Sequence, residues 1–548
     1  MTKLSQLICI LERNGENMKK FWLYLAVPAV LLNGCQRQRA ALKEAESLAV
    51  ESVESERCEG EDSESILEKV ENEKRRQETD ESPETKSEIT DSFTAGNEIV
   101  SGETSRSETG NSEAGKKQVK EAPFFGSTVS IVQSEKAQAS QITEEEIESM
   151  VREAAWDLHT VVKNGQTVVL KPNLVQMIVD STGEILEQEV NGITTDWRVA
   201  KAVVKMVREL NPDGKVYIME GSATGPTRKV MEHYHYTEEY MEGVDGFICL
   251  EEDCGGWKDF EAREVVKVDT PDGLLHKSYY FNRILYDADV VISIPALKTT
   301  SGVVVTAGIK NVSIGTPPGN LYGIGPDIPS KQRMVSHKIV DGELDKWIYD
   351  YYKAKPVNYV IVDGLQGFQS GPVPMSSQKR ETDKMNMRLV LAGKDPVAVD
   401  TVCCLVMGWD PESVGYLNLF REKDGLGKLT DLRVRGVYVD QVRKHFTIFK
   451  ENLGGVPIED GEGPDFSAEV ETDGNQITIH YQAEEGTSKI EVWVDGMFQC
   501  LKEAEEEGQI HLVVPDFSEG DHEIRIVAFD RFLNKTVYEI AAEGSSNS

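Results

Sequence analysis

The stretch Ser293-Ile-Pro-Ala-Leu-Lys-Thr-Thr-Ser-Gly-Val-Val-Val-Thr-Ala-Gly-Ile-Lys-Asn-Val-Ser-Ile-Gly315 decides the fold class, because it places two lysines and an asparagine among glycines directly after a buried-strand pattern. That pattern, residues 288–294, is short, rich in β-branched residues and apolar on both faces, as in a strand covered by helices on both sides. Residues that follow such a strand emerge at its carboxyl end, where open α/β sheets hold their ligands. The stretch therefore predicts both a fold class and a binding site.

Strand and helix patterns alternate over residues 123–457. Helix starts are marked by a capping-box pattern at Thr143, by Thr195-Asp196 and by Pro396 at its favoured first position. This alternation is typical of βα units and predicts an α/β domain with a mostly parallel, doubly wound sheet. We expect strands at residues 126–133, 167–170, 215–220, 288–294, 358–362 and 387–392, and helices at 143–163, 195–210, 343–354 and 396–407.

Polar clusters follow five of these expected strands. If the strands are parallel, the clusters share one edge of the sheet and favour a common site, although turns and helix caps are the alternative for each one. The clusters are residues 171–173, 221–226, 295–311, 363–364 and 393–396.

Lysines and asparagines in these clusters suggest an anion site. Lys171, Lys298 and Lys310 would supply point charges for a carboxylate or phosphate, and Asn173 and Asn311 would orient the ligand. The alternatives are that each lysine extends along the sheet edge to solvent, and that the asparagines cap helices.

Acidic residues near the same edge suggest a second role. Asp363, Asp395 and Asp400 would suit a hard divalent cation, yet Asp395 precedes Pro396, where a helix N-cap needs an aspartate. Asp400 could face the site or neutralise Lys394. Asp363 and His337 are the candidates for proton transfer, although a histidine without a placed partner is more often structural.

Eight motifs occur in an order that resembles the domain of unknown function 362 family, over about residues 124–437. This resemblance implies ligand-binding roles for Thr195 and Asp196 beside the lysines, and the family's reaction is unassigned. Many members carry iron–sulfur motifs and a histidine after the Lys-Thr pair, whereas this chain lacks the cysteines and has Thr300 there, so electron transfer is not implied. The motifs are Lys171-Pro-Asn173, Thr194-Thr-Asp196, Asp287-Ala-Asp289 with Ile294-Pro295, Leu297-Lys-Thr-Thr300, Gly308-Ile-Lys-Asn311, Asp363-Gly364, Gly371-Pro372 and Gly393-Lys-Asp-Pro-Val-Ala-Val-Asp400.

Alternating strands separated by turn residues fill residues 464–545, with a hairpin signal at Asp495-Gly496. They predict a small β-sandwich, and Phe529-Asp-Arg-Phe-Leu-Asn534 resembles a turn of bacterial immunoglobulin-like modules, whose usual role is spacing or adhesion. We expect strands at residues 466–471, 476–481, 490–494, 509–514, 522–528 and 536–540.

The first part of the chain predicts export and anchoring. Residues 18–35 contain two lysines, a short apolar run and Cys35 after a small residue, which resembles a bacterial lipobox, so that Met18 would be the true start and residues 1–17 would lie upstream of it. Lipid on Cys35 would hold the protein at the outer face of the cell membrane, and an ordinary signal peptide or an uncleaved anchor is the alternative. Residues 36–122 are rich in Glu, Ser, Thr and Lys and predict a disordered acidic linker.

Charge and cysteine content narrow the function. A net charge of −35 repels nucleic acid. Cys249 and Cys254 could form a disulfide, and Cys403-Cys404 fits a buried helix. Two functions remain open: an extracytoplasmic enzyme acting on a carboxylate or phosphate metabolite, with an unidentified cofactor, or a non-catalytic solute-binding or adhesion lipoprotein.

Overall fold

The computed structural model describes residues 119–177, 190–223, 226–250, 265–300, 302–318, 343–371, 373, 381–448, 454–515, 517 and 520–543. All of these lie in one compact unit, Gly110–Ser548. The predictions for the signal sequence, Cys35, Cys254 and His337, and for most of the acidic linker, lie outside the described residues. Within the described ranges, no helix is both long and apolar enough to span a membrane.

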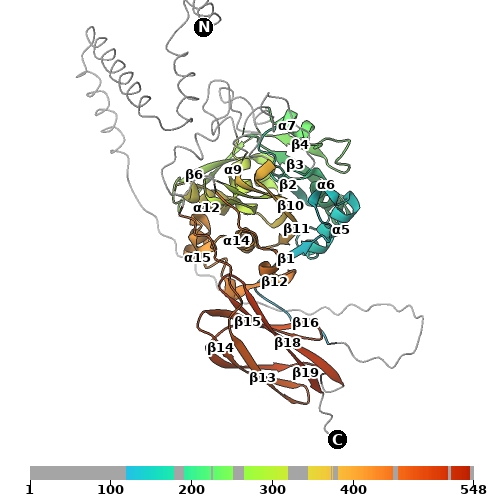
Figure 1. Ribbon diagram of the computed structural model, residues 1–548. Coiled ribbons are helices and arrows are strands. Elements are labelled where there is room, and N and C mark those ends of the chain that lie inside the picture. Colours follow the sequence, from blue (N-terminus) through green and yellow to red (C-terminus); the bar gives the residue numbers. More distant parts are fainter. Residues whose placement is uncertain are drawn as a thin grey trace, which may run out of the picture. The chain divides into compact units, whose positions relative to one another are not determined.

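A mostly parallel sheet forms the centre of the α/β part, as predicted (Figure 1). Neighbouring strands along it are parallel except at β11, which runs antiparallel to both β1 and β10. The order is β12 (Leu432–Gly436), β1 (Ser127–Gln133), β11 (Lys384–Gly393), β10 (Tyr359–Gly371), β7 (Val290–Ile294), β2 (Thr167–Pro172), β3 (Lys215–Glu220) and β4 (Gly246–Cys249), with β8 (Ala296–Thr300) and β9 (Val304–Thr306) off this path.

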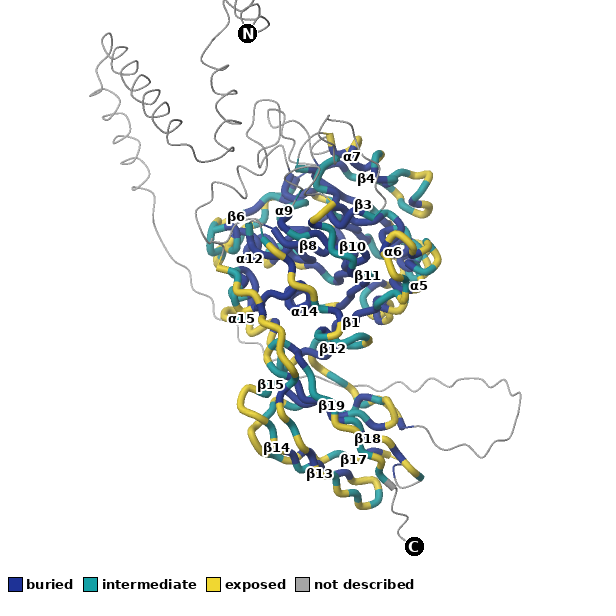
Figure 2. Tube along the Cα trace, in the orientation of Figure 1, coloured by how far each residue is buried: buried dark blue, intermediate teal, exposed yellow. Residues whose placement is uncertain are grey.

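Alternate side chains of the strands pack into two separate hydrophobic cores. Val169 and Val291 belong to the core that contains α9 (Gly308–Gly315), α12 (Glu343–Ala354) and α14 (Pro396–Val406). Val168 and Ile292 belong to the core that contains α5 (Glu144–Ala154) and α6 (Trp197–Leu210). Because successive residues of a strand point to opposite faces, helices lie over both faces of the sheet. Figure 2 shows the strands between them as mostly buried.

The stretch 293–315 contains more regular structure than its glycines predicted. After Pro295 the chain continues as β8, which pairs with the second half of β10, with Lys298 opposite Phe368. It then turns back as β9 and ends in the helix α9. The physical reason is the length of β10, whose 13 residues pair with β7 first and with β8 beyond it.

The prediction that all five polar clusters share one edge is wrong for residues 393–396. Gly393 pairs with Val360, at the start of β10, because β11 runs antiparallel to β10. Asp395 therefore lies at the edge opposite the carboxyl ends of β2, β3, β7 and β10. There it caps α14, accepting from the backbone N–H groups of Val397 (2.9 Å) and Ala398 (3.2 Å), which confirms the helix-cap interpretation.

Most other elements agree with the sequence patterns. Thr143 and Glu146 form the predicted capping box, but α5 ends at Ala154 and is followed by a separate 3₁₀ turn, Leu158–Thr160. Cys403 and Cys404 are buried in α14. The remaining elements of this part are α7 (Thr227–His233), β5 (Val265–Asp269), β6 (Ser278–Asn282), α8 (Arg283–Asp287), α15 (Gly415–Asp424) and α16 (Val439–Val442), with short 3₁₀ turns at Ala139–Gln141, Pro411–Ser413 and Leu429–Asp431.

Two antiparallel sheets make up the C-terminal part and share one hydrophobic core. One sheet has the order β13 (Phe466–Asp473), β14 (Gln476–Ala483), β17 (Glu507–Val513), and the other β16 (Met497–Glu503), β15 (Thr487–Val494), β18 (Asp521–Asp530), β19 (Lys535–Glu543). The strand β16 was not predicted, although the hairpin signal at Asp495-Gly496 directly precedes it. Val119, which the sequence assigned to the linker, is buried in this core.

Candidate functional site

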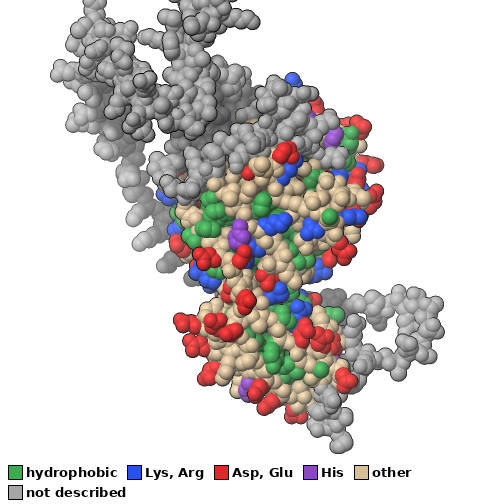
Figure 3. All heavy atoms as spheres, in the orientation of Figure 1, with side chains coloured by type: hydrophobic (Ala, Val, Ile, Leu, Met, Phe, Trp, Pro, Cys, Tyr) green, Lys and Arg blue, Asp and Glu red, His purple; other side chains and the backbone are tan. Residues whose placement is uncertain are grey.

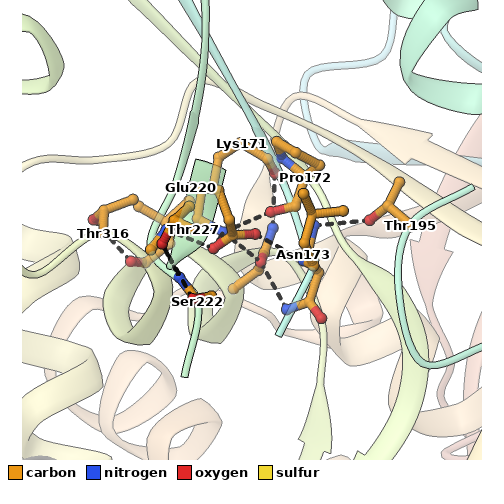
Figure 4. Close-up of polar contacts among 12 residues, drawn as sticks. Lys171, Pro172, Asn173, Thr195, Glu220, Ser222, Thr227 and Thr316 are labelled. Carbon is orange, nitrogen blue, oxygen red and sulfur yellow. Dashed lines mark hydrogen bonds and ion pairs between the residues drawn. The ribbon is translucent and has the colours of Figure 1, made fainter. Parts of the chain in front are cut away.

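Lys171 and Glu220 form a buried ion pair at the carboxyl ends of β2 and β3 (Figure 4). Lys171 Nζ lies 2.8 Å from Glu220 Oε1, and the two side chains are 0% and 2% exposed. Glu220 also accepts from the backbone N–H groups of Leu174 (2.7 Å) and Gly221 (2.8 Å). A Cβ atom on Gly315, at the end of α9, would lie 2.5 Å from Lys171 Nζ, so this close approach requires a glycine.

Two asparagines connect this ion pair to a second lysine. Asn311 Oδ1 accepts from Lys171 Nζ (3.2 Å) and from Asn173 Nδ2 (2.9 Å). Asn173 Oδ1 accepts in turn from Lys298 Nζ (2.6 Å), which also donates to the carbonyl of Ile193. One continuous hydrogen-bond network therefore joins β2, β3, β8 and α9.

Thr195 and Asp196 lie beside this network, at the start of α6. Thr195 Oγ1 accepts from Asn173 N (2.8 Å) and donates to the carbonyl of Ile294 (2.6 Å). Asp196 caps α6, and its own N–H donates to Asp363 Oδ2 (2.7 Å). Burial and the nearby charge of Asp196 raise the pKa of Asp363 to about 7. Four sequence candidates from three elements thus meet at this edge of the sheet.

Lys310 lies one residue before Asn311 but has different partners. Its Nζ donates to Thr300 Oγ1 (3.1 Å) and Thr306 Oγ1 (3.4 Å) of the β8–β9 hairpin. Burial lowers the pKa of Lys310 to about 7, opposed by the charge of Asp345. Asp345 lies on α12, and burial raises its pKa to about 6.

The electrostatics of Lys298 reflect the whole cluster. Its pKa is lowered well below the usual value, first by burial and then by the positive charges of Lys310 and Lys171, and only Glu220 opposes this effect. These lysines are buried, whereas the face drawn in Figure 3 carries acidic and basic side chains interspersed.

Asp400 supports the site without reaching the lysines. Its carboxylate accepts from the N–H groups of Gly308 (2.7 Å) and Ile309 (3.2 Å) and from the hydroxyl of Tyr416 (2.9 Å), so it holds the start of α9. Burial raises the pKa of Asp400 to about 7. The alternative in which Asp400 neutralises Lys394 is wrong, because Lys394 pairs with Asp157 at 3.2 Å.

Three acidic candidates do not form a metal-binding group. Asp363 lies near the carboxyl ends of the parallel strands, Asp395 lies at the opposite edge of the sheet, and Asp400 contacts the start of α9. In the ranges that the structure describes, no three His, Cys, Asp or Glu side chains are placed to hold a metal ion.

Sequence reasoning missed Glu220, Arg198 and Asp345. Glu220 ends a buried strand directly before Gly221, the same signal that identified Lys171, and could have been found by it. Arg198 forms a 2.6 Å ion pair with Asp196 inside the first turn of α6. Asp345 lies on an ordinary amphipathic helix, where no local signal marks it.

Comparison with known proteins agrees with the family resemblance for part of the chain. Residues 168–405 match the model of a family described as Domain of unknown function (DUF362). A thylakoid-associated protein of Synechocystis sp. is 27% identical over 256 residues, which are 46% of this chain and 66% of that protein, so this chain spans just under two thirds of that relative.

Two solved structures are similar at low level. The fibronectin(III)-like modules of Clostridium thermocellum CbhA share 19% identity over 16% of this chain and 50% of theirs, with a TM-score of 0.15. The Clostridium perfringens spore cortex lytic enzyme SleM shares 8% identity over 74% of this chain and 77% of its own, with a TM-score of 0.16. At these TM-scores neither likeness bears on fold or function. The buried network of Lys171, Glu220, Lys298 and Asn311 thus lies wholly inside the stretch that matches a family of unknown function.

Proposed function

We propose that the cluster at the carboxyl ends of β2, β3 and β8 binds a small anion, a carboxylate or a phosphate. The observation that carries this proposal is an imbalance of charge: Lys171, Lys298 and Lys310 are all buried, and among the described residues only Lys171 forms an ion pair with a carboxylate, that of Glu220. A buried cation without a counterion is costly, so the ligand-free site holds Lys298 and Lys310 with lowered pKa values.

A bound anion would reverse that effect. Among the described residues, Lys298 bonds only to Asn173 and the Ile193 carbonyl, and Lys310 only to two threonine hydroxyls. An anion beside Lys310 would supply a negative charge and raise the pKa of Lys310 from about 7. Binding should therefore take up protons near neutral pH.

Thermal unfolding of the full chain with and without oxalate or phosphate tests the proposal. We expect the anion to raise the midpoint of the parent, and to raise it much less in Lys298→Met and Lys310→Met. The matched control is Lys489→Met, which removes another fully buried lysine, one that pairs with Glu491 in the C-terminal sheets. Equal stabilisation of all four proteins would contradict an anion site at the cluster.

Catalysis is the further question within this proposal. Asp363, with a pKa of about 7 beside the network, would be the group that moves a proton if a bound carboxylate or phosphate metabolite is converted. Binding without turnover would instead support a solute-binding lipoprotein. Failure of every small anion to stabilise the parent would favour an adhesion role.

We also propose that the protein is anchored outside the cell membrane through lipid on Cys35, on the strength of the lipobox-like residues 18–35. Radiolabelled palmitate should enter the parent and fail to enter Cys35→Ala, and equal labelling of both would refute the anchor. The net charge of −35 supports the absence of a nucleic-acid partner.

Two finer descriptions of the fold belong to the same proposal. Cores on both faces of a mostly parallel sheet support a doubly wound arrangement. The shared core of the two antiparallel C-terminal sheets supports an immunoglobulin-like sandwich.

A further inference from the structure

The buried lysines differ in how many hydrogen-bond acceptors surround them. An ammonium group carries three N–H donors, and a neutral amine carries two donors and one lone pair. Lys171 Nζ has at least three acceptors among the described residues: Glu220 Oε1 (2.8 Å), the carbonyl of Pro172 (2.5 Å) and Asn311 Oδ1 (3.2 Å). One of them is a carboxylate, so this environment fits an ammonium ion.

Lys298 has a different environment. Its Nζ has two acceptors among the described residues, Asn173 Oδ1 and the carbonyl of Ile193, and both are neutral. An ammonium group here would bury a third N–H without an acceptor among the described residues, which is unfavourable even before its charge is counted. Two N–H groups and a free lone pair are what a neutral amine would present.

Neighbouring residues reinforce this difference. The charges of Lys171 and Lys310 both disfavour a third cation at Lys298, the arrangement that activates lysine nucleophiles in enzymes. Asn173, to which Lys298 donates, is only partly buried, whereas Lys298 itself is 1% exposed.

The hairpin that carries Lys298 is also strained. Val304, the first residue of β9, has φ +66°, a left-handed conformation that a β-branched residue rarely adopts. Such strain is unfavourable in itself and is concentrated at functional sites. The same hairpin supplies Thr300 and Thr306, which hold Lys310.

We propose that Lys298 is a nucleophilic amine that forms an imine with the carbonyl carbon of a small oxo acid, whose carboxylate lies toward Lys310. This inference rests on the proposed anion site and narrows its ligand to a carboxylate with an adjacent aldehyde or ketone.

The step is balanced without an oxidant or reductant. The lone pair of Lys298 Nζ forms a bond to the carbonyl carbon, and the carbonyl oxygen becomes a hydroxyl by taking the proton that the nitrogen loses. The resulting carbinolamine expels that hydroxyl as water, with a second proton from nitrogen, and the C=N double bond forms. Hydrolysis reverses each step.

Trapping with sodium borohydride tests the proposal. The full chain is incubated with glyoxylate or pyruvate, reduced, digested and mapped by mass spectrometry. We expect a reduced adduct at Lys298 in preference to the exposed lysines, its loss in Lys298→Arg and its competition by excess oxalate. Lys489→Arg, which alters a buried lysine with a carboxylate partner, should keep the adduct.

The outcomes separate the two proposals. Stabilisation by oxalate together with no adduct at Lys298 overturns the imine and leaves anion binding intact. Neither stabilisation nor adduct overturns both. If Lys298→Arg fails to fold, the position of the adduct in the parent alone decides, and labelling confined to exposed lysines refutes the proposal.

Discussion

Replacing Glu220 by glutamine removes the carboxylate that pairs with Lys171 while keeping the shape of the side chain. In the parent, Glu220 lies 2.8 Å from Lys171 Nζ and accepts two backbone N–H groups. A glutamine retains one acceptor oxygen but turns an amide donor toward Lys171 or toward a backbone N–H. The variant thus leaves a buried ammonium without its counterion.

The expected loss of stability follows from burial. Breaking a buried ion pair by removing one partner costs about 3–5 kcal/mol, because the remaining charge is uncompensated. For a domain larger than 150 residues this corresponds to a fall in the unfolding midpoint on the order of 10 °C. The double variant Lys171→Met/Glu220→Gln removes both charges and should recover a large part of the loss.

The anion proposal adds a second expectation for the same variant. With Glu220 neutral, the cluster has one more uncompensated positive charge, so oxalate or phosphate should stabilise Glu220→Gln by more than it stabilises the parent. The matched control is Glu491→Gln, which breaks the other buried lysine pair, Lys489–Glu491, at 3.1 Å and 1% exposure of each side chain. This control should lose comparable stability and gain no extra response to anions.

Differential scanning fluorimetry over a range of anion concentrations measures both effects. A loss below about 1 kcal/mol in Glu220→Gln, the value typical of exposed pairs, would refute the buried ion pair. An equal anion response in Glu220→Gln and Glu491→Gln would refute a specific charge imbalance at the cluster.

Three further predictions concern other parts of the site. Gly315→Ala should lower stability and weaken anion-induced stabilisation in thermal unfolding, because its Cβ would lie 2.5 Å from Lys171 Nζ. Gly461→Ala, whose Cβ would lie 3.7 Å from the nearest atom, controls for the loss of a glycine, and equal behaviour of the two would contradict the close approach. The pKa of Lys310 falls from 10.5 in the unfolded chain to about 7 in the folded protein. Between these pH values Lys310 is protonated in the unfolded chain and neutral in the folded protein, so its contribution makes stability rise with pH, by at most about 5 kcal/mol. Urea unfolding should therefore show Lys310→Met gaining relative to the parent as pH falls from 10 to about 7, and a constant difference would refute the shift. Asp395→Ala should lower the free energy of unfolding by about 1 kcal/mol through loss of the α14 cap, without changing oxalate affinity. Asp196→Ala removes the cap of α6 beside Asn173 and Asp363, so it should lower both the stability and the oxalate affinity. Calorimetric titration with oxalate measures the affinity of each variant, and equal affinities would contradict the placement of these caps.

Local patterns predicted the strands and the residues at their ends better than the directions of the strands. Four site residues can be identified because they belong to polar clusters that come directly after a predicted strand: Lys171, Asn173, Lys298 and Asn311. The direction of β11 could not be read in this way, because an apolar run looks the same in a parallel and an antiparallel strand. That ambiguity placed Asp395 at the wrong edge.

Contacts between residues far apart in the sequence could not be predicted from local patterns either. Glu220 and Lys171 are 49 positions apart, and only the adjacency of β2 and β3 brings them together. The strand that carries Lys298, β8, was not predicted, because its pairing with β10 depends on how far β10 extends. Such long-range choices are set by packing of the whole sheet, which no local window contains.

The geometry of the lysine cluster depends on Asp400, which lies on α14, a helix that begins at the opposite edge of the sheet. Ala307, the N-cap of α9, has no side chain that could accept a hydrogen bond, so the first N–H groups of that helix need another acceptor. Asp400 supplies it from α14, where Asp395 five residues earlier caps α14 itself. The motif 393–400 thus fixes two helix starts with two aspartates, and α9 then presents Lys310 and Asn311. The carboxylates of Asp395 and Asp400 accept hydrogen bonds from backbone N–H groups. We therefore expect a ligand to contact the lysines that α9 helps to position, and not these two carboxylates.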